Sequence, residues 1–301
     1  MALHAPADFT PAPSHTADAE ISDAFTAREM SAAGGAQIRD VSLSDLTPSV
    51  LATTKRLFLK HKLLVFKDQQ LSDDDILRFA QAFGPLEVNQ VKSPDGGVLQ
   101  AIHSIANFDA QGRPASSPLL KSNFNWHSDK SYLPKPSLMT MLYGLEVPPS
   151  GGDTEFSNME MAYDELPQSM KDRLEGLIVT QSFEYMLDTL GQRAIIEEKD
   201  IPPPVKHPLV RTHPETGKKS LFVGMYACAI DGMPQGEARA LIAELLAHAT
   251  QEKYRFLQQW QANDFVCWDN RSLVHRAIPN YEMGKYRRVL RRCVVRGGVP
   301  A

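Results

Sequence analysis

Cysteine is scarce in this chain, and long apolar runs are missing from it. The three cysteines, Cys228, Cys267 and Cys293, are odd in number and widely spaced. This excludes the disulfide framework of a small secreted domain and predicts reduced thiols in a cytoplasmic protein. No apolar stretch reaches the roughly 18 residues that a membrane-spanning helix needs, and the N-terminus lacks the pattern of a signal peptide. We therefore expect a cytoplasmic protein with no membrane segment.

An excess of basic charge is also missing. The 32 lysines and arginines are outnumbered by 36 aspartates and glutamates, which gives a formal net charge of −4. Proteins that bind nucleic acid or anionic membranes usually carry a basic surface, so neither partner is expected.

Composition along the chain indicates one domain behind a tail. Residues 1–20 are rich in Ala, Pro, Asp, Ser and Thr and predict a mobile N-terminal tail. Residues 21–301 contain no internal repeat or long linker, which favours a single domain. The sequence does not set the oligomeric state, and a homo-oligomer stays open.

Helical periodicity is clear in a few segments. Residues 48–61 and 236–249 repeat apolar side chains at helical spacing. Ser72 followed by Asp75 predicts the capped start of another helix, which Gly84 ends. A further helix is marked by Met170, Leu174, Leu177 and Ile178.

Short strands dominate the rest. They are predicted at 63–66, 138–143, 154–157, 207–212, 220–224, 264–268 and 288–295. Residues 213–218 have the turn chemistry of a hairpin between two of them. This pattern predicts a mainly β fold with flanking helices. The polar stretch 88–124 is long for a loop and predicts an active-site lid.

Two histidines and an aspartate form the pattern that carries chemistry. His127 and Asp129 are two residues apart, so on a strand both side chains leave the same face. His275 follows much later, after the apolar strand 265–268, and is expected at the end of a strand of its own. Two imidazoles and one carboxylate on one face of a metal leave three positions open, which is the arrangement of non-haem Fe(II) oxygenases. Zinc is the main rival metal, although many zinc hydrolases carry a helical His-Glu-x-x-His motif that this chain lacks.

Together with Gly151-Gly152-Asp153-Thr154 and the arginines of 287–292, these motifs resemble a known family. It is the taurine dioxygenase / 2,4-dichlorophenoxyacetate (aryloxyalkanoate) oxygenase family of Fe(II)/2-oxoglutarate-dependent dioxygenases. The resemblance runs from about residue 38 to about residue 298. It implies a double-stranded β-helix (jelly-roll) core, Fe(2+) held by His127, Asp129 and His275, and 2-oxoglutarate and O2 as co-substrates.

The resemblance also implies which residues hold the organic substrates. The family pattern Arg-x-Leu/Met-x-Arg matches Arg288-Val289-Leu290-Arg291-Arg292. Arg288 and Thr154 would bind the distal carboxylate of 2-oxoglutarate, whereas Arg292 and Asn123 would contact the primary substrate.

Two positions depart from the family pattern. Arg288 follows His275 by two residues more than is usual, which leaves Arg287 and Arg291 as an alternative pair on the opposite face of the strand. His103 lies where taurine dioxygenase has a substrate-binding histidine, but its spacing to His127 does not match, so we expect a surface histidine.

The resemblance implies oxidation of a small organic anion, since Arg292 would otherwise be a buried charge without a partner. Aryloxyalkanoates, alkyl sulfonates and carnitine-type acids stay open, and residues 221–227 are similar to the herbicide-cleaving branch, which favours an aryloxyalkanoate. Hydroxylation beside an ether oxygen or a sulfonate would cleave the ether or C–S bond. Two other classes also stay open: a zinc-dependent hydrolase with the same cluster, and a non-catalytic jelly-roll binding protein.

Overall fold

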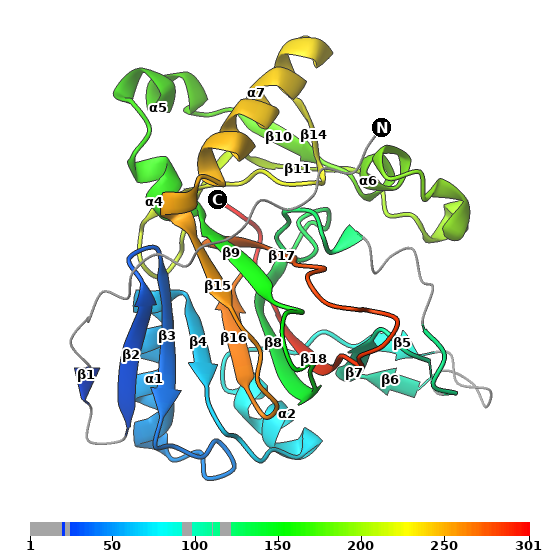
Figure 1. Ribbon diagram of the computed structural model, residues 1–301. Helices are drawn as coiled ribbons and strands as arrows, with labels where there is room; N and C mark the ends of the chain where they lie inside the picture. Colours follow the sequence, from blue (N-terminus) through cyan, green and yellow to red (C-terminus); the bar gives the residue numbers. More distant parts are fainter. Residues whose placement is uncertain (1–19, 22–24, 92–97, 110, 115–121) are drawn as a thin grey trace.

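Two β-sheets face each other across an apolar core (Figure 1). The computed structural model describes residues 20–21, 25–91, 98–109, 111–114 and 122–301. The larger sheet has eight strands in the order β1-β2-β3-β4-β16-β8-β18-β7, and the smaller sheet has three in the order β15-β9-β17. This arrangement confirms the predicted mainly β fold with a jelly-roll core.

The strands of the larger sheet, in chain order, are β1 (Glu20–Ile21), β2 (Thr26–Ser31), β3 (Gly34–Arg39), β4 (Leu63–Phe66), β7 (Ile102–Ala106), β8 (Ser137–Glu146), β16 (Phe265–Asp269) and β18 (Val289–Arg296). The strands of the smaller sheet are β9 (Thr154–Asn158), β15 (Arg255–Gln258) and β17 (Leu273–Ala277). Three further small sheets contain β5 (Asn89–Val91) with β6 (Val98–Gln100), β12 (Val210–Thr212) with β13 (Lys219–Leu221), and β10 (Ile178–Gln181) with β11 (Val205–Pro208) and β14 (Ala227–Ile230).

The larger sheet is apolar on both faces. In β4, Leu63 and Val65 pack into the core between the sheets, while Leu64 and Phe66 pack toward the helices outside. Alternate side chains of a strand point to opposite faces, so a strand buried on both sides must be apolar throughout, as β4 is. The inner face of this sheet is the one that borders the site described below.

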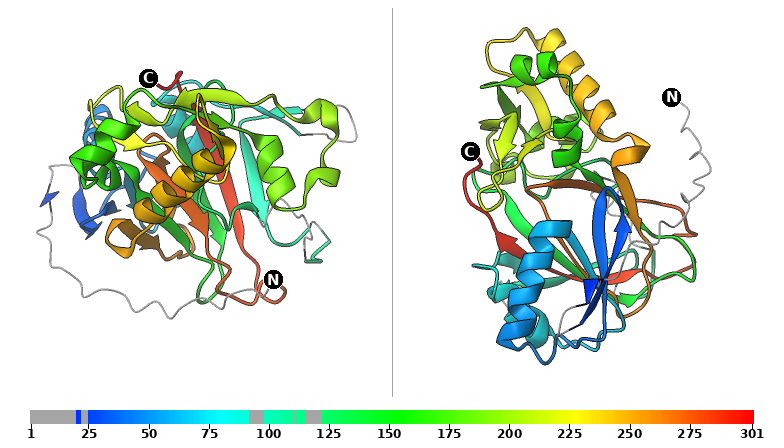
Figure 2. Two further views of the ribbon diagram at one scale, coloured as in Figure 1. Left: turned by 90° about the horizontal axis from the view of Figure 1, so that it is seen from above. Right: turned by 90° about the vertical axis from the view of Figure 1, so that its left-hand side faces the viewer.

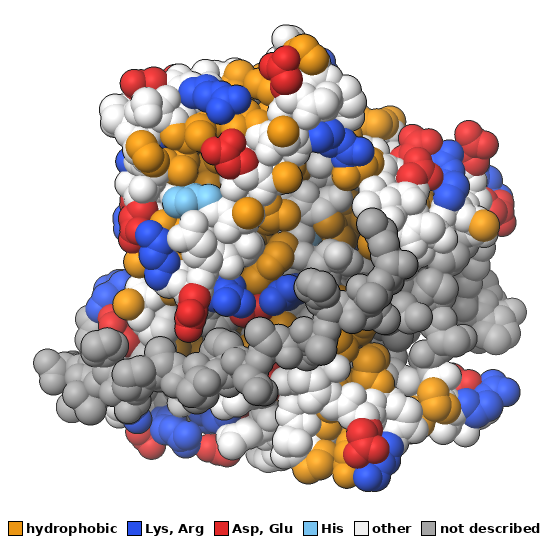
Figure 3. All heavy atoms as spheres, turned by 45° about the horizontal axis from the view of Figure 1, so that its top comes forward, with side chains coloured by type: hydrophobic (Ala, Val, Ile, Leu, Met, Phe, Trp, Pro, Cys, Tyr) orange, Lys and Arg blue, Asp and Glu red, His pale blue; other side chains and the backbone are white. Residues whose placement is uncertain are grey.

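The described helices are α1 (Pro48–His61), α2 (Asp73–Gln81), α4 (Met159–Asp164), α5 (Gln168–Leu174), α6 (Phe183–Thr189) and α7 (Gln235–Ala249), with short 3-10 turns at Arg193–Ile195, Glu198–Asp200 and Glu252–Tyr254. Figures 1 and 2 show α1 and α2 beside the larger sheet, and α7 with β10 and β14 at the other end of the molecule. No helix of the described residues is long and apolar enough to cross a membrane. Acidic and basic side chains are interspersed over the face seen in Figure 3.

Most of the predicted elements are present. Strand 63–66 and helix 48–61 have the predicted bounds, and Ser72 and Asp75 form the predicted capping box of α2. The hairpin at 213–218 is confirmed, since β12 and β13 pair across it.

Three predictions about elements were wrong in part. Leu177 and Ile178 do not continue a helix, because α5 ends at Leu174 and Gly176 has a φ of 71° that favours glycine. Residues 207–212 divide between two strands of different sheets. The stretch 88–124 is not a loop throughout, because β7 pairs with β18 inside it.

Parts of two predicted segments lie outside the described residues. These parts are residues 1–19 of the tail and residues 92–97, 110 and 115–121 of the proposed lid. The lid therefore stays a prediction.

A buried ion pair stabilises the turn between β16 and β17. Asp269 is 1% exposed and accepts hydrogen bonds from Arg271 at 2.7–2.8 Å and pairs with His213 at 3.0 Å. Burial alone would raise the pKa of Asp269, but its bonds with His213 and Arg271 hold the pKa below its usual value. This turn leads into the strand that carries His275.

We expect Asp269→Asn to lower the free energy of unfolding by about 3–5 kcal/mol, because Arg271, whose side chain is 12% exposed, then keeps only its exposed partner Glu215. Urea unfolding measures this, and Glu215→Gln is the control, since that exposed partner of Arg271 should contribute less than about 1 kcal/mol. Because the pKa of Asp269 is lowered on folding, the stabilisation is present at neutral pH and is lost as the pH falls below about 4. Equal losses in the two variants would contradict this account.

Candidate active site

The two histidines of the predicted cluster are brought together by backbone pairing. His127 and His275 form an isolated antiparallel bridge, in which each N–H donates to the other's carbonyl at 3.0 and 2.8 Å. His275 lies at the centre of β17, opposite Phe156 of β9, and not at the end of a strand as expected. His127 is in no regular strand, and Asp129 already belongs to a turn. The predicted convergence of the side chains therefore comes from this bridge and turn.

The three candidate ligand side chains converge on one point. Their ligand atoms all lie within 4.8 Å of one another. His127 Nε2 is 4.0 Å from Asp129 Oδ1, and His275 Nε2 is 3.9 Å from Asp129 Oδ2. His127 Nδ1 is 2.8 Å from the carbonyl of Asn125, which makes it the protonated nitrogen and leaves the lone pair of Nε2 for a metal. Two imidazole nitrogens and a carboxylate suit a divalent transition metal.

The surroundings keep these groups in the protonation states that a metal requires. Burial lowers the pKa of His127, and burial together with the neighbouring His127 lowers that of His275 to about 3. Burial would raise the pKa of Asp129, but Arg292 and the two histidines hold it below its usual value. Neutral imidazoles and an ionised carboxylate are the forms that bind metal, so the donor set fits one.

The Asp129 carboxylate is fixed from both sides. Oδ2 accepts a hydrogen bond from the Thr140 hydroxyl at 2.5 Å, and Asn270 in turn donates to Thr140 at 2.9 Å. Oδ1 is 3.0 Å from Nη2 of Arg292 on β18. Asn270 also accepts from the backbone N–H of Asp129 at 3.2 Å, so one buried amide orients the whole turn.

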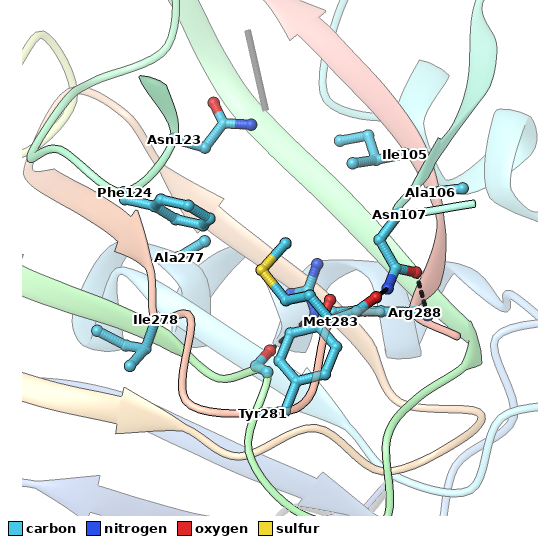
Figure 4. A pocket seen from close by; sticks show the side chains of 11 residues that line it. Ile105, Ala106, Asn107, Asn123, Phe124, Ala277, Ile278, Tyr281, Met283 and Arg288 are labelled. Carbon is cyan, nitrogen blue, oxygen red and sulfur yellow. Dashed lines mark hydrogen bonds between the residues drawn. The ribbon is translucent and has the colours of Figure 1, made fainter. Parts of the chain in front are cut away.

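The second arginine, Arg288, points into a cavity of about 50 Å³ just before β18 begins. Figure 4 shows it beside Met283 and Tyr281, with Asn123 and Phe124 on the other side of the cavity. Its Nε donates to the carbonyl of Gly152 at 2.8 Å. Within the described part of the chain, no carboxylate lies within ion-pair distance of Arg288, and burial lowers its pKa. A guanidinium in this state can bind an anion.

Thr154 and Arg288 both lie near Trp260. Thr154 is the first residue of β9 and accepts a hydrogen bond from Trp260 Nε1 at 3.0 Å. The guanidinium of Arg288 lies 5.7 Å from the ring of that same tryptophan. Since the Thr154 hydroxyl accepts from Trp260, its own hydrogen remains available to an anion.

The two candidate arginine pairs face opposite sides of β18. Arg292 lies against Asp129, whereas Arg291 pairs with the exposed Asp73 and Arg287 with the half-exposed Glu146. Of the two registers left open by the sequence, the structure has Arg288 and Arg292 on the side of the ligand cluster.

His103 is not the surface histidine that we expected. It lies on β7 directly opposite Arg292 of β18, so both side chains leave the same face of the sheet. Burial and the charge of Arg292 lower the pKa of His103 to about 4. The strand pairing that places it there joins segments far apart in the sequence, and for this reason spacing alone missed it.

Sequence reasoning also missed an aromatic cluster near Asp129. Tyr132 lies 4.7 Å, between ring centroids, from both Phe183 and Tyr226. Burial and the charge of Asp129 raise the pKa of Tyr132 to about 12, so its hydroxyl stays protonated. The segment before Tyr226 lies against the metal motif, since Met225 N–H donates to the carbonyl of Trp126 at 2.9 Å. The aromatic cluster therefore forms an apolar wall beside the ligand cluster.

Fold and site together define a jelly-roll protein with a candidate metal centre of two histidines and one carboxylate. Residues 26–294 match the family described as Taurine catabolism dioxygenase TauD, TfdA family. The chain belongs to this family.

Known relatives and a solved structure agree with the family match. The chain is 38% identical over 270 residues to an alpha-ketoglutarate-dependent 2,4-dichlorophenoxyacetate dioxygenase of Cupriavidus pinatubonensis, covering 85% of this chain and 92% of that protein. It is 33% identical over 285 residues to an alkylsulfatase of Acinetobacter baylyi, covering 90% and 85%. The crystal structure of AAD-2 in complex with Mn(II) and N-oxalylglycine superposes with a TM-score of 0.81 at 32% identity, covering 92% of this chain and 98% of that one. The predicted class, a 2-oxoglutarate-dependent dioxygenase, is confirmed.

Proposed function

We propose that this chain holds Fe(II) through His127, Asp129 and His275 and hydroxylates a small organic acid, most favourably an aryloxyalkanoate. Where the hydroxylated carbon bears an ether oxygen or a sulfonate, the bond to that group then breaks. The observation that carries the proposal is the convergence of His127, Asp129 and His275 on one point, with Arg292 paired to Asp129 and Arg288 on the same side of β18.

The metal supplies the redox chemistry when bound, coupling decarboxylation of 2-oxoglutarate to oxidation of a C–H bond by O2. The chain's task is to hold, orient and shield. Iron is favoured over zinc because three ligands on one face leave room for a bidentate co-substrate and O2. The carbonyl of Asn125 and the hydroxyl of Thr140 keep His127 and Asp129 in their coordinating orientations.

In this proposal Arg288 and Thr154 bind the distal carboxylate of 2-oxoglutarate. Support comes from the guanidinium of Arg288, which lacks a carboxylate partner among the described residues and lies 5.7 Å from the ring of Trp260. The Thr154 hydroxyl, which accepts from Nε1 of the same tryptophan, gives further support. A planar guanidinium binds a carboxylate through two parallel hydrogen bonds, and a hydroxyl can add a third.

Arg292 is the proposed partner for the anionic group of the primary substrate. The expectation that Arg292 lacks a partner in the protein was wrong, because its Nη2 lies 3.0 Å from Asp129 Oδ1. In the proposal a further N–H of Arg292 binds the anion, which would place the neighbouring carbon near Asp129 and the metal. The rings of Tyr132, Phe183 and Tyr226 provide an apolar wall that suits an aryl group. Asn123 lines the cavity that contains Arg288 and is assigned to substrate contact as well.

We expect Arg292→Ala to raise the KM for the primary substrate by about thirtyfold or more, with little change in the KM for 2-oxoglutarate. It should also increase the fraction of 2-oxoglutarate consumed without product. Steady-state kinetics with both substrates varied measures this. Arg291→Ala is the matched control, because Arg291 pairs with Asp73 outside the site and should be silent. If Arg291→Ala raised the KM for the primary substrate and Arg292→Ala did not, the anionic group of the substrate would bind on the other face of β18.

A substrate panel tests the proposed substrate class. Aryloxyacetates, aryloxypropionates, alkyl sulfonates and alkyl sulfates would be compared by coupled consumption of 2-oxoglutarate, each against its uncharged ester or amide where one exists. Aryloxyalkanoates should give the highest kcat/KM, and their esters should be poor substrates. Preference for alkyl sulfonates or sulfates would retain the mechanism and overturn the aryl assignment. Hydrolysis without O2 would favour a zinc hydrolase instead, and binding without turnover a jelly-roll binding protein.

Location and partners form part of the same proposal. The three cysteines are free thiols, which suits the cytoplasm. The interspersed charges on the face in Figure 3 offer no continuous basic surface there for nucleic acid. The proposed partners are thus small molecules, and size-exclusion chromatography would show whether the chain also forms a homo-oligomer.

A further inference from the structure

The connection between β17 and β18 carries Arg288. It runs through residues 278–288 without a regular helix or strand. An irregular segment of this length has considerable backbone freedom to lose on ordering. Arg288 can bind a carboxylate through two parallel hydrogen bonds only if this connection is held in one conformation.

Asn107, at the end of β7, makes the contacts that could fix it. Its side-chain Nδ2 donates to the carbonyls of Met283 and Tyr286, both at 2.8 Å. Its Oδ1 accepts from the backbone N–H of Arg288 at 2.7 Å, and its own backbone N–H donates to the Arg288 carbonyl at 3.3 Å. Asn107 is 7% exposed, so water competes little for these bonds. One buried carboxamide therefore uses both its donor and its acceptor groups on a single connection (Figure 4).

The other end of the connection is fixed independently. Asn280 accepts from the N–H of Gly152 and donates to Asp153, both at 2.8 Å. The Gly152 carbonyl in turn accepts from Arg288 Nε. Arg288 is thus held at its backbone by Asn107 and along its side chain by Gly152, which leaves the terminal nitrogens to reach the ligand.

We propose that Asn107 is the positioning residue that sets where Arg288 presents its guanidinium to the distal carboxylate of 2-oxoglutarate. This rests on the proposed role of Arg288. Asn107 directly follows β7, which pairs with β18, so it connects the irregular segment to the end of the sheet. Removing its side chain takes a hydrogen-bond partner from the carbonyls of Met283 and Tyr286 and from the Arg288 N–H.

The test is calorimetric titration of 2-oxoglutarate into the Mn(II)-loaded protein without O2, so that binding is measured without turnover. Asn107→Ala should weaken 2-oxoglutarate binding by about ten- to a hundredfold, the scale of a small misplacement of a binding group. Binding of 2-oxobutanoate, which has the same keto acid end and no distal carboxylate, should change less than about twofold if only the Arg288 contact is lost.

Two further variants make the test specific. Glu282 lies on the same connection, and its side chain pairs with the exposed Lys285. The variant Glu282→Ala should therefore bind 2-oxoglutarate like the wild type. Asn107→Asp retains the acceptor for the Arg288 N–H and loses both donor hydrogens, so it should also weaken the binding of 2-oxoglutarate selectively. This variant replaces Asn107→Ala in the test if the alanine variant does not fold.

The inference is overturned if both ligands weaken equally, since this indicates general damage, or if both Asn107 variants bind 2-oxoglutarate like the wild type. Failure of the proposed function looks different. In that case the wild type itself would bind 2-oxoglutarate no more tightly than 2-oxobutanoate, and Arg288→Ala would have no effect.

Discussion

Replacing His127, Asp129 or His275 with alanine is expected to abolish turnover and metal binding while leaving the fold intact. Each side chain supplies one of only three proposed protein ligands. The backbone bridge between His127 and His275 and the pairing of β17 with β9 do not depend on these side chains. Metal content after dialysis, succinate formation and the thermal midpoint should be measured on the same preparations.

His248→Ala is the matched control for this set. His248 lies on α7 and bonds the carbonyl of Ala162 at 2.8 Å, away from the ligand cluster. It should keep normal metal content and activity. Full metal binding and normal turnover in any one of the three cluster variants would disprove the ligand assignment.

Arg288→Ala should raise the KM for 2-oxoglutarate by about thirty- to several-thousand-fold, whichever primary substrate is used. This range corresponds to the loss of a buried charge-assisted contact, about 2–5 kcal/mol. The KM for the primary substrate should change little, because that anion is assigned to Arg292. Initial rates over a wide range of 2-oxoglutarate concentrations measure the effect.

Arg287→Ala is the neighbouring control. Arg287 pairs with Glu146 on the outer face, and both side chains are nearly half exposed. Its loss should leave both Michaelis constants unchanged. If the 2-oxoglutarate defect followed Arg287 and spared Arg288, the assignment of the anion site would be wrong.

Elements that are determined by a few neighbouring residues could be predicted from the sequence. The continuous apolar run of β4 and the Ser72–Asp75 capping box of α2 are determined within a few residues, and both occur where they were predicted. The helix α2 itself ends at Gln81, before the predicted end at Gly84. The end of α5 was missed because Leu177 and Ile178 match helical spacing, yet Gly176 adopts a positive φ and Ile178 begins β10.

The site was predictable only where residue types are diagnostic. His127, Asp129 and His275 could be chosen from spacing and type, but the bridge that joins them is a long-range backbone contact. His103 lies on β7 and Asn107 directly follows it, in a stretch without clear periodicity, and their positions depend on the pairing of β7 with β18. Such pairings have no local signature in a single sequence.

The account is tested most directly by succinate formation from 2-oxoglutarate in the presence of Fe(II), O2 and an aryloxyalkanoate. It predicts succinate in amounts matching the phenol released, none with Zn(II) in place of Fe(II), and none in Asp129→Ala. Phenol release that proceeds with Zn(II) or without 2-oxoglutarate would contradict the account.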